Sequence, residues 1–257
     1  MGVFLMNCRE LVALTSDLAS RLCGCGAETR LIVQTAERVA RACGGSAVII
    51  VDPGKISIKV EYQGSVCETF VPSPAIHLNM GCLISYVRLC RQLEQGAISP
   101  ETFSHQVKEV KSISYHPLLI IVAIGLATGA FSGINGGSLG ASCVGILSGM
   151  FVMACRIGMH KARLFPLFIF TVCGFAGTMI SCLMGTWIFN LDSYNLVIAM
   201  VVSLLPLIPG FPFINGILDL FKGYVTMGIS RLISTFMILF AVSLGIMMAF
   251  SLLPSGW

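Results

Sequence analysis

The sequence predicts an α+β domain over residues 1–116, followed by an all-α membrane domain of about five transmembrane helices over residues 117–257. The chain of 257 residues is 56% hydrophobic and 11% charged, whereas soluble domains carry about 25% charged residues. This shortage is local, because the second domain holds only five of the 16 Lys and Arg residues and two of the 12 Asp and Glu residues. Such a composition indicates that lipid or other apolar helices surround the second domain.

Helices and a small antiparallel sheet are expected in the first domain. Leucines at helical spacing between Leu11 and Leu22 indicate an amphipathic helix. From Lys55 to Tyr62 apolar and polar residues alternate, which is typical of a strand with one buried and one wetted face. The expected elements are helices over about 7–23, 28–42 and 81–94, a short helix beginning at Ser99-Pro100-Glu101, and strands over 47–51, 55–62 and 68–71.

The second domain contains five apolar runs, one of which is interrupted. A span needs about 20 residues, so the fourth run is too short alone, and a second apolar piece follows it directly after Pro209-Gly210. A short hydrophobic segment broken by Pro and Gly is typical of a discontinuous helix at a transport site. We therefore expect the fourth span to be broken at Pro209-Gly210. The runs cover 117–132, 139–155, 166–189, 196–209 with 211–221, and 232–253.

The basic residues of the second domain predict its topology. All five fall between the second and third runs or between the fourth and fifth, and the other two connections contain none. Because cytoplasmic loops are enriched in Lys and Arg, we expect these connections and the N-terminal domain in the cytoplasm. With five spans, the C-terminus then lies outside. The residues are Arg156, Lys161, Arg163, Lys222 and Arg231.

Several functional classes lack their usual sequence patterns. The four histidines are scattered and the eleven cysteines form no CxxC pair, so we expect no metal, no cofactor, and cysteines that are reduced and structural. No GxxxxGK[ST] loop is present, which argues against an ATP-driven pump. The net charge of +4 comes mostly from the second domain and indicates topology rather than nucleic-acid binding. The N-terminus lacks the continuous apolar core of a signal peptide.

Small residues recur at helical spacing in two of the apolar runs. Such stripes let helix backbones approach closely. They indicate packing either within the chain or against another subunit, which leaves a homo-oligomer open. The stripes are Gly125, Gly129 and Gly133 in the first run and Gly177, Ser181 and Gly185 in the third.

Asp219 is the main candidate for a role in transport. It is the only acid within the apolar runs of the second domain, and an acid beside the bilayer is by default a functional hypothesis. In a helix over 211–221, Asn215, Asp219 and Lys222 would share one face. The helix follows Pro209-Gly210, so its first amides could face an anion. The alternative is that Asp219 and Lys222 form an ordinary interfacial ion pair.

Two further segments contain candidate residues. Asn135 and Gly136 lie in a glycine-rich connection between the first two runs, where they could contact substrate or simply form a tight turn. Glu28 lies between the two helices expected at the N-terminus. It is the candidate of the first domain, with the alternative that it only interacts favourably with a helix dipole.

Three segments together resemble the threonine/serine exporter (ThrE-like) family. They are Pro209 to Gly223, with the sequence PGFPFINGILDLFKG, Gly26-Ala27-Glu28-Thr29 and Asn135-Gly136-Gly137. The resemblance covers nearly the whole chain and is closest to the short YjjP-like branch, in which a succinate exporter is split between two subunits. It implies export of small hydrophilic metabolites from the cytosol, driven by the proton gradient, and a separate small membrane subunit that supplies a missing half.

Together these observations predict a subunit of a secondary, proton-coupled exporter in the bacterial inner membrane, and not an enzyme. The expected partners are a small carboxylate substrate, either a dicarboxylate or an amino acid, the lipid bilayer and the second subunit. Lys222 and the helix N-terminus would attract the carboxylate, Asn215 would hydrogen-bond it, and Asp219 would carry a proton or tune Lys222. The alternatives are a non-transporting scaffold or sensor subunit, and a membrane-anchored enzyme with its chemistry in residues 1–116.

Overall fold

The computed structural model describes residues 6–112 and 115–253. The chain forms two compact units, the first made of Met1–Ile113 and Phe211–Leu232, and the second of Ser114–Gly210 and Ile233–Trp257. Unlike the domains expected from the sequence, these units are not continuous along the chain. The physical reason is that residues of 211–232 make buried polar contacts with the N-terminal residues, as described below.

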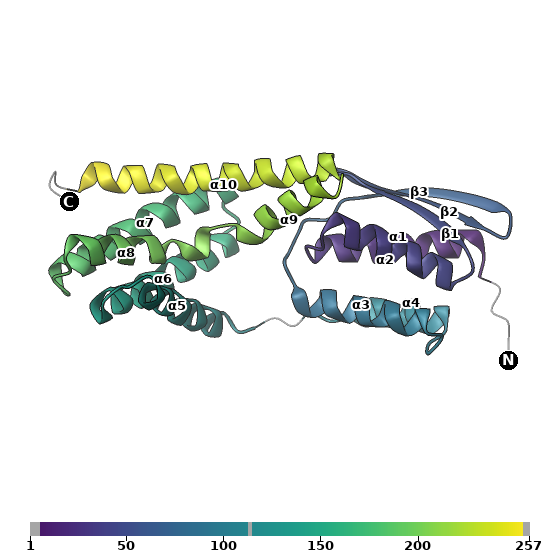
Figure 1. Ribbon diagram of the computed structural model, residues 1–257, viewed down its shortest axis with the longest axis horizontal. Helices are drawn as coiled ribbons and strands as arrows, with labels where there is room; N and C mark the ends of the chain where they lie inside the picture. The colour runs from purple at the N-terminus through teal and green to yellow at the C-terminus, as the bar shows by residue number, and fades with distance from the viewer. Residues whose placement is uncertain (1–5, 113–114, 254–257) are drawn as a thin grey trace. The chain divides into compact units, whose positions relative to one another are not determined.

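The first unit begins with the helices and strands that the sequence predicts. Hydrogen bonds from side chains fix the helix starts: Asn7 forms a capping box with Glu10, and Asn79 and Ser99 cap later helices. The third strand starts earlier than predicted, at Ser65. The elements are α1 (Cys8–Gly24), α2 (Thr29–Ala42), β1 (Ser46–Val51), β2 (Lys55–Tyr62), β3 (Ser65–Pro72), α3 (Met80–Glu94) and α4 (Pro100–Glu109) (Figure 1).

The sheet has the order β1-β2-β3, with both pairs antiparallel. Its inner face packs on α1 and α2, and α3 and α4 pack beyond these helices. The alternation along β2 is confirmed, because Ile56, Ile58 and Val60 are buried. The outer face is less polar than expected, since Val48 and Phe70 are exposed on it.

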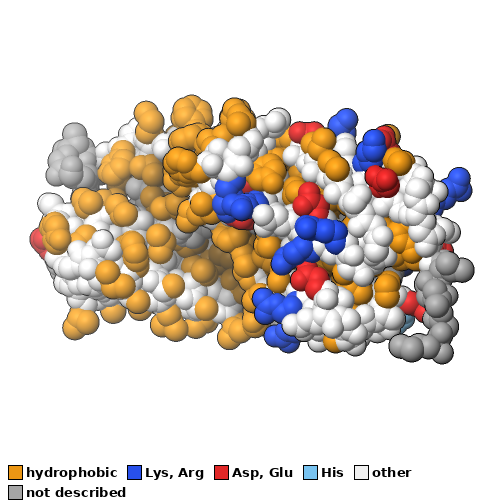
Figure 2. Space-filling model, turned by 45° about the vertical axis from the view of Figure 1, so that its right-hand side comes forward, with side chains coloured by type: hydrophobic (Ala, Val, Ile, Leu, Met, Phe, Trp, Pro, Cys, Tyr) orange, Lys and Arg blue, Asp and Glu red, His pale blue; other side chains and the backbone are white. Residues whose placement is uncertain are grey.

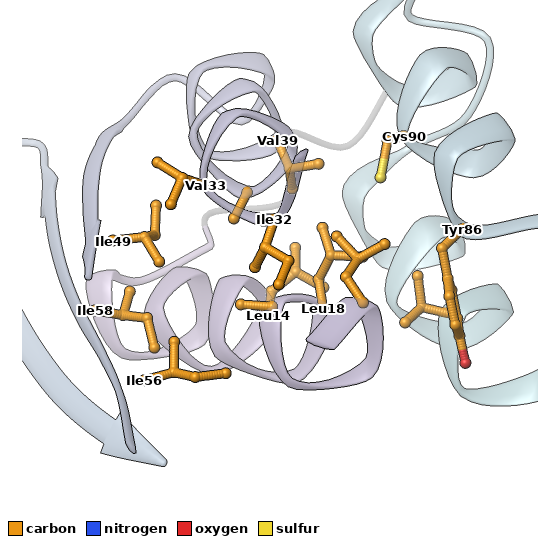
Figure 3. Close-up of a cluster of buried hydrophobic side chains, with 14 of the residues drawn as sticks. Leu14, Leu18, Ile32, Val33, Val39, Ile49, Ile56, Ile58, Tyr86 and Cys90 are labelled. Carbon is orange, nitrogen blue, oxygen red and sulfur yellow. The ribbon is translucent and has the colours of Figure 1, made fainter. Parts of the chain in front are cut away.

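A single hydrophobic core holds the first unit together. Figure 3 shows side chains from α1, α2, β1, β2 and α3 pointing toward one another. Met227 belongs to the same core although it lies far along the chain. Burial of this kind contributes about 25 cal/mol per Å² of apolar surface, so the N-terminal residues form a folded body. The labelled residues are Leu14, Leu18, Ile32, Val33, Val39, Ile49, Ile56, Ile58, Tyr86 and Cys90.

The remaining helices include those that are long and apolar enough to cross a membrane. Four of the described helices are long and apolar enough to cross a bilayer alone, and α8 with α9 adds a fifth span if the broken pair counts as one. Hydrophobic side chains cover most of the second unit's face in Figure 2, whereas most charges seen there lie over the first unit. The helices are α5 (Pro117–Ile134), α6 (Leu139–Lys161), α7 (Pro166–Trp187), α8 (Ser193–Ser203), the 3₁₀ turn η1 (Leu205–Leu207), α9 (Gly210–Phe221) and α10 (Val225–Leu252).

Three of the five basic residues assigned to connections lie instead within helix ends, and they are Arg156, Lys161 and Arg231. Arg156 belongs to α6, where its Nη1 donates to the carbonyl of Pro206 at 2.7 Å and its guanidinium stacks over Phe170. Arg231 lies in α10, which begins before the apolar run does. The helices are longer than the apolar runs because a charge ends an apolar run in the sequence without ending the helix, so the predicted topology stays a prediction. A helix continues wherever the charge finds a partner.

The small residues pack helices of the same chain together. A Cβ atom on Gly125 would lie 3.0 Å from the carbonyl oxygen of Ile146 in α6. A Cβ atom on Gly129 would lie 3.1 Å from the carbonyl oxygen of Ser142 in the same helix. The stripe in α7 likewise faces described residues of α6 and α8. Packing between helices of the same chain therefore explains Gly125 and Gly129. It does not explain Gly133, because no described atom lies within 4 Å of the position of a Cβ there.

A buried ion-pair cluster as candidate functional site

A cluster of polar side chains joins the α1–α2 connection to α9 and the first turns of α10. Asn215 and Asp219 are buried in α9 and Lys222 follows its last residue. As predicted, the three side chains share one face, because all of them contact the segment between Gly26 and Thr29. The whole cluster lies within the first compact unit.

Asp219 acts as a helix cap from a distant part of the chain. Its carboxylate accepts from the backbone N–H and the hydroxyl of Thr29, at 3.0 and 2.9 Å. Thr29 is the first residue of α2, whose own N-cap, Glu28, makes no side-chain cap bond. Asp219 is fully buried, and the α2 N-terminus offers it unpaired amides and a positive dipole end. Every partner donates, which suits the ionised carboxylate.

Arg231 is the partner that the sequence-based prediction missed. Its Nη1 lies 3.0 Å from the Asp219 carboxylate, and its Nη2 donates to the Ala27 carbonyl at 2.9 Å. The first contact is close enough for an ion pair but not aligned as a hydrogen bond, and Nε has no hydrogen-bond partner among the described residues. Only 6% of Arg231 is exposed. The sequence did contain a signal for this pair. Arg231 is a single cation directly before the last apolar run, and it follows Asp219, the only acid within the apolar runs, by twelve residues.

Lys222 pairs with Glu28 and not with Asp219. Its Nζ lies 2.6 and 2.7 Å from the two carboxylate oxygens of Glu28. The expected alternative of an interfacial pair between Asp219 and Lys222 is therefore wrong, because both partners point across to the N-terminal residues. The side chains of Lys222 and Glu28 remain 26% and 21% exposed, so water reaches this pair.

Asn215 completes the attachment of the connection. Its amide donates to the Gly26 carbonyl at 3.0 Å. Gly26 has a φ of +85°, and a Cβ there would meet Leu78 at 3.2 Å, so a glycine suits both the backbone and the space. The turn that ends α1 is closed by a hydrogen bond from the Ala27 N–H to the Leu22 carbonyl at 3.1 Å. The connection thus presents two carbonyls and one carboxylate to α9 and α10.

Two glycines set the distance between α9 and α10. A Cβ on Gly228 would lie 2.8 Å from the carbonyl oxygen of Gly216, and one on Gly216 would lie 3.2 Å from that of Gly228. Between the helices, Gly223 has a φ of +85° and the Tyr224 N–H donates to the Asp219 carbonyl at 2.8 Å. This close approach brings Arg231 within ion-pair distance of the Asp219 side chain.

The other predicted site residues belong to the second unit and make local contacts. The Asn135 amide donates to the Phe131 carbonyl of its own helix at 2.7 Å, and Gly136 has a φ of +80°. These contacts favour the tight-turn alternative. The neighbouring connection before α8 contains Asp192, whose pKa is lowered by a hydrogen bond from the Asn195 amide.

Pro209 and Gly210 lie at the predicted helix break. η1 ends at Leu207 and α9 begins at Gly210, so the interruption falls where the sequence places it. Nothing described lies within 4 Å of the position of a Cβ on Gly210. The structure thus confirms the helix break at these two residues, and their role in the substrate pathway stays a prediction.

The eleven cysteines are free thiols in this structure. Burial raises the pKa of Cys90 to about 12 and that of Cys43 to about 11, so neither is a reactive thiolate at neutral pH. Among the described residues, no group of three or more His, Cys, Asp or Glu side chains could hold a metal ion.

Comparisons with known proteins place the chain in a family by its sequence. A family model described as "Putative threonine/serine exporter" matches residues 13–253. A "Probable succinate transporter subunit YjjP" of Klebsiella aerogenes is 24% identical over 97% of this chain and 96% of its own length, and the protein of the same name from Escherichia coli is 24% identical over 90% and 91%. No solved structure matches. The chain belongs to the ThrE family of threonine/serine exporters.

Proposed function

We propose that this protein is one subunit of a secondary, proton-coupled exporter of small carboxylate metabolites in the bacterial inner membrane, with its N-terminal domain in the cytoplasm. Membership of an exporter family and the membrane-capable helices support the transport role. The names of the relatives, which call them succinate transporter subunits, support a dicarboxylate substrate and a second membrane subunit. Threonine and serine are the competing substrates, and they too present a carboxylate.

The observation that carries this proposal is a pair of cations that face carboxylates, Lys222 directly after α9 and Arg231 in α10. Lys222 holds the Glu28 carboxylate at a place that water reaches, and Asn215 lies on the same face. A substrate carboxylate needs the same partners, an ammonium and an amide donor. Asp219 is the acid whose protonation would weaken its ion pair with Arg231 and so couple a proton to movement of the cluster.

The proposal is tested by co-expressing the chain with a candidate small membrane subunit and measuring succinate, threonine and serine in the medium. Asp219→Asn should lower export and flatten its dependence on external pH, while Asp192→Asn, in a connection of the second unit, should change neither. Export is normalised to the amount of protein in the membrane, so that loss of folded protein is not counted. Export by Asp219→Asn at the wild-type rate and pH dependence would contradict the role of Asp219.

A scaffold subunit is the second candidate, because Asn215 and Asp219 use their hydrogen bonds inside the chain. It predicts that export continues when the polar group of Asn215, Asp219 or Lys222 is removed by substitution, provided that the partner still assembles. Co-purification of the partner with each variant separates the two candidates. Lost export with an intact complex favours the transport role.

A further inference from the structure

Glu28 occupies the place of a ligand rather than that of an ordinary helix cap. As the N-cap of α2 it could accept a hydrogen bond from the first amides of that helix, but its side chain makes no such bond. The Thr29 N–H donates to Asp219 instead. The contact found for the Glu28 carboxylate among the described residues is the one with Lys222, at 2.6 and 2.7 Å.

The Glu28–Lys222 pair differs from the neighbouring Asp219–Arg231 pair in its access to water. The side chain of Asp219 is 0% exposed and that of Arg231 is 6% exposed, so water does not reach this inner pair. About a quarter of the Lys222 side chain is exposed. Ion pairs that water reaches add little net stability, so another carboxylate can replace Glu28 at small cost.

We propose that the Glu28 carboxylate is an internal competitor at a carboxylate-binding site centred on Lys222, and that a carboxylate group of the exported metabolite displaces it. The inference rests on the proposed function, because it takes the exported metabolite as the ligand. Asn215 lies on the same face, where its amide holds the Gly26 carbonyl. Displacement of Glu28 would therefore release one of the contacts that attach the α1–α2 connection to α9.

A competitor within the chain lowers the apparent affinity for an external ligand. The observed Kd equals the intrinsic Kd divided by the fraction of molecules in which Lys222 is free. Removing the charge of Glu28 should therefore tighten binding, whereas loss of a merely structural ion pair would leave binding unchanged or weaken it. The direction of the change distinguishes the two roles.

The test is equilibrium binding of radiolabelled succinate, and separately of threonine, to the full-length chain co-purified with its partner subunit in lipid nanodiscs. Glu28→Gln should lower the Kd of the transported compound by about tenfold if Lys222 is free in about a tenth of the molecules. Lys222→Gln should remove measurable binding, alone and combined with Glu28→Gln. Glu94→Gln is the matched control, since Glu94 pairs with Arg38 away from this cluster.

An unchanged or higher Kd for Glu28→Gln overturns the inference. If that variant does not fold, Glu28→Asp retracts the carboxylate by one methylene and should lower the Kd by a smaller factor; an unchanged or higher Kd then overturns the inference. The wild-type complex separates this failure from that of the proposed function. If the wild-type complex exports and binds succinate or threonine but the Glu28 variants bind no tighter, only the inference fails. If the wild-type complex neither exports nor binds any of the carboxylates, the inference and the proposed function both fail.

Discussion

Asp219 lies at a position with no exposed surface, where two hydrogen-bond donors of Thr29 and the guanidinium of Arg231 surround its carboxylate. The arrangement resembles an N-cap supplied from outside the helix, strengthened by an ion pair. Breaking a buried pair on one side is costly because the remaining charge has neither water nor a partner. The cluster therefore anchors the α1–α2 connection in addition to any part it has in transport.

Replacing Asp219 by Asn should lower the free energy of unfolding by about 3–5 kcal/mol, since Arg231 is left buried without its counter-charge. The double variant Asp219→Leu/Arg231→Met should recover much of this loss, because a buried pair replaced by apolar groups often costs little. Both are measured by urea unfolding in detergent, followed by a fluorophore attached to the first unit. A double variant as unstable as the single one would contradict the ion-pair explanation.

Thr29→Val tests the hydroxyl that donates to Asp219. Valine keeps the shape of the side chain and loses one hydrogen bond to a charged group, so unfolding should become easier by about 1.5–3 kcal/mol. Thr15→Val is the matched control, because Thr15 is equally buried but its hydroxyl bonds only to carbonyls of its own helix. Equal losses for the two variants would show that the contact with Asp219 adds nothing.

Burial of Cys90 should make it unreactive in the native protein. With its pKa raised to about 12 by burial, the thiolate is scarce at pH 8, and the thiolate is the nucleophile. We expect a pulse of iodoacetamide at pH 8 to modify Cys90 at least about a hundredfold more slowly in the folded than in the denatured chain. Mass spectrometry gives the modified fraction, and similar rates in both states would rule out the buried position.

At the scale of elements, the contact between α9 and α10 depends on Gly216 and Gly228. Gly228→Ala places a methyl group 2.8 Å from the Gly216 carbonyl oxygen, so the helices must separate and Asp219 must move away from Arg231. We expect the free energy of unfolding to fall by about 1–3 kcal/mol, as for other overpacked sites.

Gly158→Ala is the control in α6, where no described atom lies within 4 Å of the added methyl group. It should be neutral or stabilising by about 0.5–1 kcal/mol. Thermal unfolding compares the two, and equal behaviour would contradict the close packing.

At the scale of the whole molecule, the number of spans decides on which side of the membrane the chain ends. The structure contains four spans, or five if α8 and α9 cross as one broken span. Arg163 and Lys222 lie in the predicted connections. Arg156, Lys161 and Arg231 lie in the helix turns next to those connections, so all five fit the charge pattern predicted from the sequence. With five spans, the two ends of the chain lie on opposite sides, and with a re-entrant α8–α9 pair they lie on the same side.

Reporter fusions distinguish these topologies. We expect alkaline phosphatase fused after Trp257 to be active, since five spans place it outside, and a green fluorescent protein fused before Met1 to fluoresce in the cytoplasm. Phosphatase fused within 190–195 should be active and within 161–165 inactive, which provides internal controls. A fluorescent fusion after Trp257, together with these controls, would show four spans.

The sequence by itself determined the elements, because their signals are local. Alternation along β2, the helix start at Ser99 and the apolar runs after Pro117 each lie within a few turns or strand repeats, and so does the shared face of Asn215 and Asp219. Helical periodicity fixes which side chains point together, and the helix break at Pro209-Gly210 follows from local chemistry. These features needed no knowledge of distant contacts.

Only the tertiary structure decided the partners of those side chains. Asp219 meets Thr29, 190 positions away along the chain, and Lys222 meets Glu28 rather than its neighbour Asp219. Arg231 joins the cluster because glycines let α9 and α10 approach closely. Ion-pair partners depend on how backbones far apart in sequence pack, and a pattern that repeats every few residues contains no information about that separation.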